Sequence, residues 1–204
     1  NMLKPDVTLP IGYSTADIKA AICARLPVKE SEILDIRIIR QALIAGRNAE
    51  PCYKLTVGVS FSGEREAGLL KMKKKTLPYS ENALSVPPLR LKSRPIIVGS
   101  GPAGLFCALV LSEAGARPIV LERGLAVEER IKRVNEFIRE GRLDVECNIQ
   151  FGEGGAGTYS DGKLKVGSPD CVKNYILSRF IEAGAPEEIA YSTSAHLGTD
   201  RLSG

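Results

Sequence analysis

The chain has 204 residues and a formal net charge of +4, and 44% of its residues are hydrophobic. This composition is ordinary for a globular protein of one or two domains. Because it contains neither an apolar run of membrane-spanning length nor the apolar segment of a signal peptide, we expect a cytoplasmic protein without a membrane partner. The five scattered cysteines and single histidine argue against a zinc site and a disulfide framework.

Charge is distributed unevenly along the chain. Residues 1–93 carry 15 Lys and Arg against 9 Asp and Glu, whereas residues 94–204 carry 13 against 15. A stretch with four prolines separates the two parts, at 78–95. The sequence therefore predicts a small N-terminal domain over 1–78, a linker over 79–93 and a second domain over 94–204.

The N-terminal part shows the patterns of a small α+β domain, β-α-β-β or similar. A strand is predicted over 3–10, and a helix begins at Ser14, where Asp17 stands at the capping-box position. Residues 33–39 are rich in β-branched side chains, and residues 52–59 alternate between apolar and polar, so both segments are predicted strands.

A basic cluster, KMKKK, follows at residues 71–75. The simpler interpretation is a solvated edge or loop. The alternative is a site for nucleic acid or another polyanion, although the scarcity of nearby aromatic side chains gives base stacking little support.

The most informative stretch is 94–124. Its apolar residues 96–98 predict a buried parallel strand, and Gly99, Gly101 and Gly104 follow in G-x-G-x-x-G spacing. Residues 105–112 predict a helix that ends near Gly115, with Cys107 expected in the core. A second strand is predicted over 118–121.

These residue types in this order suit a dinucleotide. Gly99 permits a tight turn, Gly101 permits close approach of a pyrophosphate, and Gly104 permits close packing of helix on strand. The first N–H groups of the helix face the phosphates. Glu122 stands at the end of the second strand, where a carboxylate accepts hydrogen bonds from both ribose hydroxyls and repels a 2′-phosphate, which favours FAD or NAD over NADP. A glycine turn in an ordinary α/β protein is the alternative.

Two helices and a glycine-rich loop follow. An amphipathic helix is predicted over 127–140, with Val134 and Ile138 on its apolar stripe and Gly141 beyond its end. A second is predicted over 168–184, with Ser168 as N-cap and Pro169 at the first helical position. The lone His196 is interpreted as structural or, alternatively, as a substrate-facing acid or base.

The loop at 150–164, QFGEGGAGTYSDGKL, has too many glycines to form a hydrophobic face. We expect a functional loop whose backbone comes close to a ligand, with a mobile surface loop as the alternative. Ser160, Asp161 and Lys163 supply polar groups, and Lys163 suits an anion such as a phosphate or a reduced flavin.

Together these segments resemble the bacterial family of FAD-dependent dehydrogenases or oxidoreductases of unassigned substrate. The resemblance rests on VGSGPAGLFCAL (98–109), LERG (121–124), VEER (127–130), NIQFGEGGAGTYSDGKL (148–164) and HLGTD (196–200). It implies a Rossmann-like FAD/NAD(P)-binding domain of the glutathione-reductase type, here an incomplete α/β domain preceded by a small α+β domain. Because family members are more than twice as long, we expect this chain to be an N-terminal fragment that is inactive alone.

The resemblance implies a non-covalent FAD, with NAD(P)H as a possible electron donor, a small-molecule substrate and hydride transfer. It assigns no catalytic residue and no metal. The expected cofactor-binding residues are Gly99, Ser100, Gly101, Pro102, Ala103, Gly104, Glu122, Arg123, Arg130, Gly154, Gly155, Ala156, Gly157, Ser160, Asp161 and Lys163.

Two other functions stay open at this point. The first is a flavin-containing nucleic-acid-binding or RNA-modification protein that uses the basic N-terminal domain. The second keeps the nucleotide unit and replaces FAD with NAD.

Overall fold

A computed structural model describes residues 2–46, 49–72, 78–79, 83–159 and 169–193. Contacts divide the chain into two units, each with its own secondary structure. The first comprises Asn1–Ala83 and Gly167–Ala195, and the second comprises Leu84–Val166 and His196–Gly204. Helices and strands occur in both, so the protein is of the mixed α/β kind.

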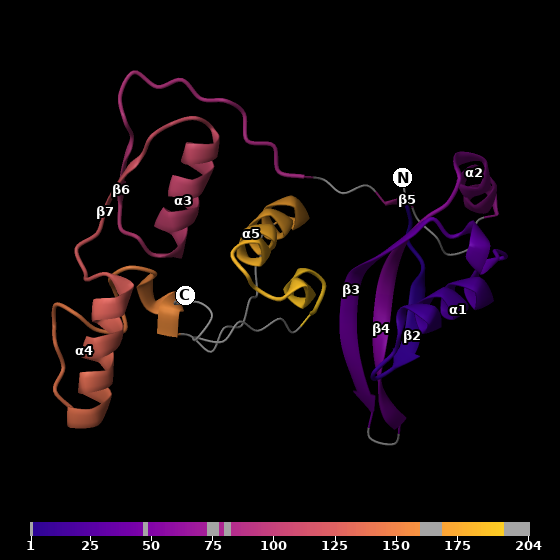
Figure 1. Ribbon diagram of the computed structural model, residues 1–204, viewed down its shortest axis with the longest axis horizontal. Helices are drawn as coiled ribbons and strands as arrows, with labels where there is room; N and C mark the ends of the chain where they lie inside the picture. Colours follow the sequence, from indigo (N-terminus) through magenta and orange to yellow (C-terminus); the bar gives the residue numbers. More distant parts are fainter. Residues whose placement is uncertain (1, 47–48, 73–77, 80–82, 160–168, 194–204) are drawn as a thin grey trace. The chain divides into compact units, whose positions relative to one another are not determined.

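The first unit is built on an antiparallel sheet around one long strand (Figure 1). Its elements are β1 (Met2–Leu3), β2 (Asp6–Pro10), α1 (Thr15–Arg25), β3 (Asp35–Gly46), β4 (Ala49–Ser60), α2 (Gly63–Lys71) and β5 (Pro78–Tyr79). Strand β4 pairs with β3 on one side and with β1 and β2 on the other, and β1 also pairs with β5. With β1 and β2 counted as one interrupted strand, the topology is β-α-β-β-α-β, the ferredoxin-like arrangement.

The core of this unit lies on one face of the sheet. Leu55, Val57 and Val59 alternate along β4, and each is 0% exposed. They belong to the same cluster as Ile18 and Ile22 of α1, so α1 covers this face. The alternation predicted for 52–59 is confirmed, because successive strand residues point to opposite faces.

Helix α1 begins at the predicted capping box. The Asp17 N–H donates to the Ser14 hydroxyl at 3.3 Å, and the Ser14 N–H donates to the Asp17 carboxylate at 2.7 Å. The Ser14 hydroxyl also donates to the Asp17 carboxylate at 2.7 Å, and this bond, together with that from the Ser14 N–H, lowers the pKa of Asp17. Helix α2 and strand β5 were not anticipated from the sequence. Of the basic cluster, Lys71 is exposed at the end of α2, and residues 73–75 lie outside the described residues.

A later segment also belongs to the first unit. Helix α5 (Asp170–Glu182) is followed by the 3-10 helix η3 (Glu187–Ala190). The chain then pairs with β3, because the Gln41 N–H donates to the Tyr191 carbonyl at 2.8 Å and the Thr193 N–H donates to the Gln41 carbonyl at 2.9 Å. The contacts thus group this segment with the N-terminal part, whereas the sequence assigned it to 94–204.

The start of α5 differs from the prediction by one residue. Pro169 is the N-cap and has an extended ψ of 148°, so it precedes the first helical residue. Its carbonyl accepts hydrogen bonds from Val172 and Lys173, both at the beginning of the helix. Ser168, the predicted N-cap, lies outside the described residues.

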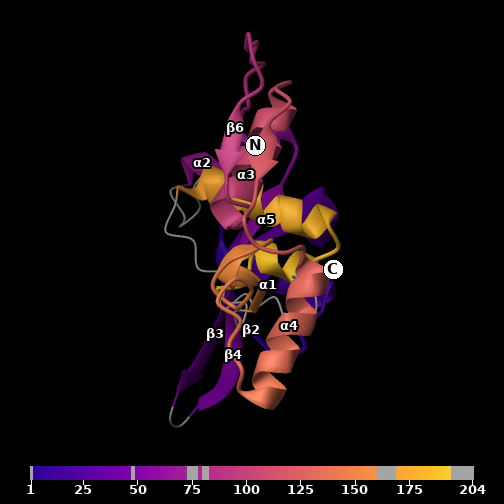
Figure 2. The same cartoon turned by 90° about the vertical axis from the view of Figure 1, so that its left-hand side faces the viewer.

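The second unit contains a parallel strand-helix-strand motif. Its elements are β6 (Ile96–Val98), α3 (Pro102–Glu113), β7 (Ile119–Leu121), α4 (Val127–Glu140) and the 3-10 helix η2 (Gly155–Tyr159). Strands β6 and β7 are in parallel register, with Ile97 opposite Val120. Helix α3 lies beside β6 in both views (Figures 1 and 2). The predicted strand, helix and second strand are confirmed, and α4 ends at Gly141 in the left-handed conformation, as predicted.

The predicted burial in this unit was partly wrong. Ile96 is 63% exposed and Val98 85% exposed, Cys107 is exposed on α3, and Ile138 is 71% exposed on α4. Among the described strands β6 pairs only with β7. Parallel strands are buried on both faces only where helices cover both sides of the sheet. None of the described helices is both long and apolar enough to cross a lipid bilayer.

The core of the first unit gives a direct stability prediction. Leu55→Ala is expected to lower the free energy of unfolding by about 2–5 kcal/mol, because a buried leucine leaves a cavity. Leu43→Ala is the matched control, since Leu43 is 57% exposed on β3, and its effect should stay within about 0.5 kcal/mol. Urea denaturation of both variants tests this, and equal losses would contradict the described core.

Candidate dinucleotide-binding site

The site begins where β6 ends. Gly99 has a φ of +94°, and its N–H donates to the Leu121 carbonyl at 2.7 Å, which ties the turn to β7. Gly101 caps α3, whose first i→i−4 bond runs from the Leu105 N–H to the Gly101 carbonyl at 3.0 Å. The N–H groups of Ala103 and Gly104 precede this bond, so the helix itself gives them no partner. Ala103 is exposed, which leaves the start of α3 accessible to an anion.

Gly104 packs the helix onto the turn. A Cβ at this position would overlap the Gly99 carbonyl oxygen and lie 3.6 Å from Cγ2 of Ile97. Only glycine therefore fits here, as the sequence predicted. At Gly101, by contrast, an ideal Cβ would only touch the Gly155 Cα, at 4.0 Å, so the described protein atoms alone do not require glycine at this position.

Glu122 is held at the end of β7 by the turn of residues 99–101 between β6 and α3, which we call the phosphate loop. Its Oε2 accepts from the Ser100 N–H at 2.6 Å and the Ser100 hydroxyl at 2.9 Å, and its Oε1 accepts from the Gly124 N–H at 2.8 Å. Backbone hydrogen bonds from Ser100 and Gly124 lower the pKa of Glu122, so the carboxylate is ionised. The Arg123 N–H also contributes to the lowered pKa. A carboxylate has only about four acceptor positions, so a ribose hydroxyl gains room on Glu122 when the Ser100 hydroxyl rotates away.

The glycine-rich loop lies against the same turn. The Gly154 N–H donates to the Ser100 carbonyl at 2.9 Å. A Cβ on Gly155 would stand 3.2 Å from the Gly101 Cα and 3.3 Å from the Pro102 ring. The two glycine segments singled out from the sequence thus meet at the start of α3. Ser160, Asp161 and Lys163 lie outside the described residues, as does His196.

The other side of the loop is joined to the turn between β7 and α4. The Val127 N–H, at the start of α4, donates to the Glu153 carboxylate at 2.8 Å, and the Glu153 N–H donates to the Leu125 carbonyl at 3.2 Å. Gly124 and Gly152 approach so closely that a Cβ on Gly124 would overlap Gly152. Sequence reasoning missed Glu153, although an acid near a helix start is a known favourable pairing.

The two predicted arginines occupy different surroundings. Arg130 is 0% exposed, and its guanidinium binds backbone carbonyls of the glycine-rich loop rather than facing solvent. The Arg123 side chain is 73% exposed and donates to both Glu146 oxygens, at 2.9 and 2.7 Å. It also lies 5.7 Å from the centre of the Phe151 ring.

Among the expected loop ligands, Ala156 is exposed and Gly157 is half-buried, and Gly157 lies beside Pro102.

The described donor set fits one end of a dinucleotide. Free helix N–H groups suit a diphosphate, and an ionised carboxylate beside them suits a ribose. Within the same described residues, no cluster of three or more His, Cys, Asp or Glu side chains is arranged to hold a metal ion.

Comparisons with known proteins agree with this chemistry. The family described as "FAD binding domain" matches residues 92–132, which contain β6, α3, β7 and the start of α4. Proteins of this family are usually flavin-dependent oxidoreductases or monooxygenases. An uncharacterized protein of Clostridium beijerinckii is 38% identical over 191 residues, which are 92% of this chain. The chain spans 36% of that relative's length.

The contact of Gly104 with the turn predicts that the effect of a Gly→Ala substitution depends strongly on its position in the chain. Gly104→Ala is expected to destabilise the second unit and to abolish dinucleotide binding, because the added Cβ overlaps the Gly99 carbonyl. Gly68→Ala in α2 is the matched control, since nothing lies within 4 Å of its Cβ position, and the change should raise helix stability by up to about 1 kcal/mol. Thermal unfolding and ligand titration of both variants distinguish these outcomes.

The lowered pKa of Glu122 predicts a pH-dependent contribution to stability. Glu122→Gln removes the charge and places an amide near the N–H donors of Ser100 and Gly124. Since the folded-state pKa lies below the ordinary value, the stabilisation is present above that value and is lost as the pH falls through the folded-state pKa. The difference in unfolding free energy between wild type and Glu122→Gln should therefore shrink below about pH 4. Urea titrations across this range test it, and a pH-independent difference would contradict the described contacts.

Proposed function

We propose that the protein is an FAD-dependent oxidoreductase, of the dehydrogenase type, that holds a non-covalent flavin on a Rossmann-like strand-helix-strand unit. The observation that carries the proposal is the joint placement of the α3 N-terminus and the ionised Glu122 at the ends of β6 and β7. The family match over these residues supports FAD as the cofactor.

The residues in the site have separate roles in this proposal. The N–H groups of Ala103 and Gly104 bind the diphosphate, and Gly101 lets it approach the backbone. Glu122 accepts a hydrogen bond from the adenosine ribose, and its negative charge disfavours a ligand with a 2′-phosphate. Gly154 and Gly155, which contact the phosphate loop, border the diphosphate on its other side.

A bound FAD supplies the hydride-accepting chemistry, and the protein supplies binding and orientation. The electron donor is a nicotinamide or another reduced small molecule. In this proposal the described residues hold the ADP half of the ligand.

The test is to purify the full chain, record its visible spectrum and identify the cofactor released by heat. Flavin absorption bands with released FAD, or stoichiometric uptake of added FAD, are expected because the site recognises the ADP half, which FMN lacks. NADP serves as the discriminating competitor, since its 2′-phosphate meets the Glu122 carboxylate. A colourless protein that does not take up FAD but binds NAD would overturn the assignment in favour of a nicotinamide site.

A further inference from the structure

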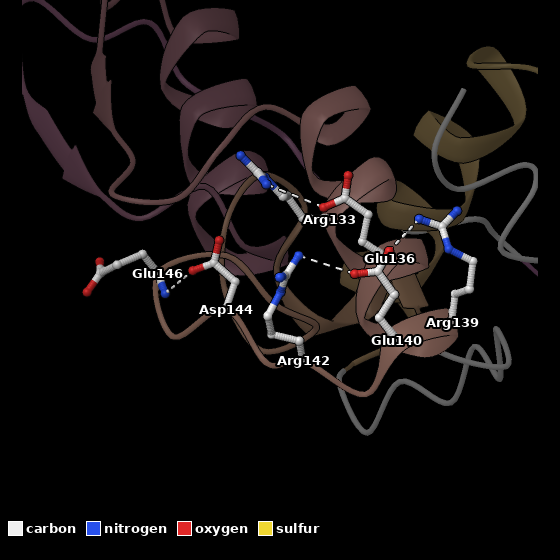
Figure 3. Close-up of polar contacts among 7 residues, drawn as sticks. All are labelled: Arg133, Glu136, Arg139, Glu140, Arg142, Asp144 and Glu146. Atoms are coloured by element: carbon white, nitrogen blue, oxygen red, sulfur yellow. Dashed lines mark hydrogen bonds and ion pairs between the residues drawn. The ribbon is translucent and has the colours of Figure 1, made fainter.

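Arg130 is the one arginine of α4 that the structure places in the interior. Its side chain is 0% exposed, and Val134 is the other buried residue of the helix. Figure 3 shows that Arg133 and Arg139 instead make ion pairs with Glu136 and Glu140, at 3.3 and 2.7 Å, among exposed side chains. The ion pairs on the exposed face of α4 therefore do not explain why Arg130 is buried.

The guanidinium group of Arg130 is satisfied by the backbone of residues 148–155, which comprise the first part of the glycine-rich loop and the two residues before it. Its Nη2 donates to the carbonyls of Ile149 at 3.1 Å and Gly155 at 2.9 Å, its Nε to that of Asn148 at 3.3 Å, and its Nη1 to that of Glu153. In the described part of the chain, all its hydrogen-bond partners are backbone carbonyls. Four residues of one loop therefore converge on a single planar fork of donors.

Glycines make this convergence possible. Gly152, Gly154 and Gly155 have φ values of +108°, +78° and +61°, which allow the loop to turn its carbonyls inward. At Gly152, a Cβ would lie 2.5 Å from Cδ of Arg130 and 2.8 Å from its Nε. The absence of a side chain at Gly152 is thus required by the arginine itself. The Tyr159 ring, 5.0 Å away, closes the site around the guanidinium.

One of the residues that Arg130 binds, Gly155, also contacts the phosphate loop. Gly155 offers its carbonyl to Nη2, and its Cα lies against Gly101 and Pro102 at the start of α3. Beside it, the Gly154 N–H donates to Ser100 at 2.9 Å. Arg130 therefore holds one side of a short peptide whose other side borders the candidate diphosphate position.

We propose that Arg130 is a positioning residue, which fixes the 148–155 backbone against the start of α3 and so sets the shape of the diphosphate site, and that it is not itself a ligand of the cofactor. The inference rests on the proposed function. It differs from the sequence prediction that Arg130 contacts the cofactor, because all the described hydrogen bonds of the guanidinium go to backbone carbonyls of residues 148–155.

Three variants of the full chain distinguish a positioning role of the Arg130 guanidinium from an effect of its positive charge alone. Arg130→Lys keeps a positive charge but has a compact ammonium that cannot span four carbonyls, and Arg130→Met keeps much of the apolar stem without charge. Arg133→Met is the matched control, because it removes a surface charge from the same helix. The measurements are the FAD dissociation constant by calorimetry, hydrogen exchange of the loop amides without ligand, and far-UV circular dichroism as a check on folding.

Both Arg130 variants are expected to weaken FAD binding by at least about tenfold, because the loss of one charge-assisted hydrogen bond has about that effect. Faster hydrogen exchange of the Gly154 and Gly155 amides should accompany this loss of affinity. The FAD affinity of Arg133→Met should stay within about twofold of that of the wild type. Wild-type affinity in a folded Arg130→Lys protein would overturn the inference, since charge alone would then suffice.

Chemical rescue provides an independent readout. In Arg130→Ala, methylguanidinium below denaturing concentrations should restore FAD affinity, because it can occupy the vacated space and bind the carbonyls, whereas methylammonium should not. Equal effects of the two ions, or no rescue of a folded variant, would contradict positioning by a planar fork. If wild type and Arg133→Met both fail to bind FAD, the proposed function fails, and this inference with it.

Discussion

The candidate site depends on how closely α3 approaches the end of β6. Gly104 sits so near the Gly99 carbonyl that any side chain would overlap it. This contact brings the helix start, whose first N–H groups have no partner within the helix, directly over the turn that follows the strand. Because Gly99 is also bonded to the Leu121 carbonyl, the same turn fixes the distance between the helix start and the end of β7, where Glu122 stands.

A second constraint comes from the interior of the glycine-rich loop. A buried guanidinium costs free energy unless its donors are satisfied, and here the backbone carbonyls of the loop satisfy them. The loop in turn needs glycine at Gly152, where the arginine leaves no room, and favours it at Gly155, where φ is +61° and the start of α3 packs closely. The burial of the Arg130 charge and the glycines of the loop therefore depend on each other. Together they connect α4 to the phosphate loop through Gly154 and Gly155.

Local patterns were enough to predict the strand-helix-strand unit and α4. Gly99, Gly101 and Gly104 have spacing that only a turn between strand and helix explains, and Gly141 marks a helix end through its left-handed conformation. The capping box at Ser14 is equally local. In each case the residues that determine the structure are neighbours in the chain, so spacing alone carries the information.

Features that depend on distant contacts were not predictable in this way. The pairing of Gln41 with Ser192 brings a late segment to the first sheet, and no periodic pattern signals it. Arg130 lies in a helix full of surface charges, so its burial becomes evident only once Gly155 and Asn148 are placed around it. The Ser100 hydrogen bonds to Glu122 occupy acceptors that the sequence analysis assigned to ribose hydroxyls, and they likewise become evident only in the folded turn.

The central claim is that the α3 start and Glu122 together bind the ADP half of FAD. A crystal structure of the full chain with FAD tests it most directly. The account predicts the diphosphate at the N–H groups of Ala103 and Gly104, with a ribose hydroxyl donating to Glu122. A diphosphate bound elsewhere, or an adenosine ribose that does not contact Glu122, would contradict it.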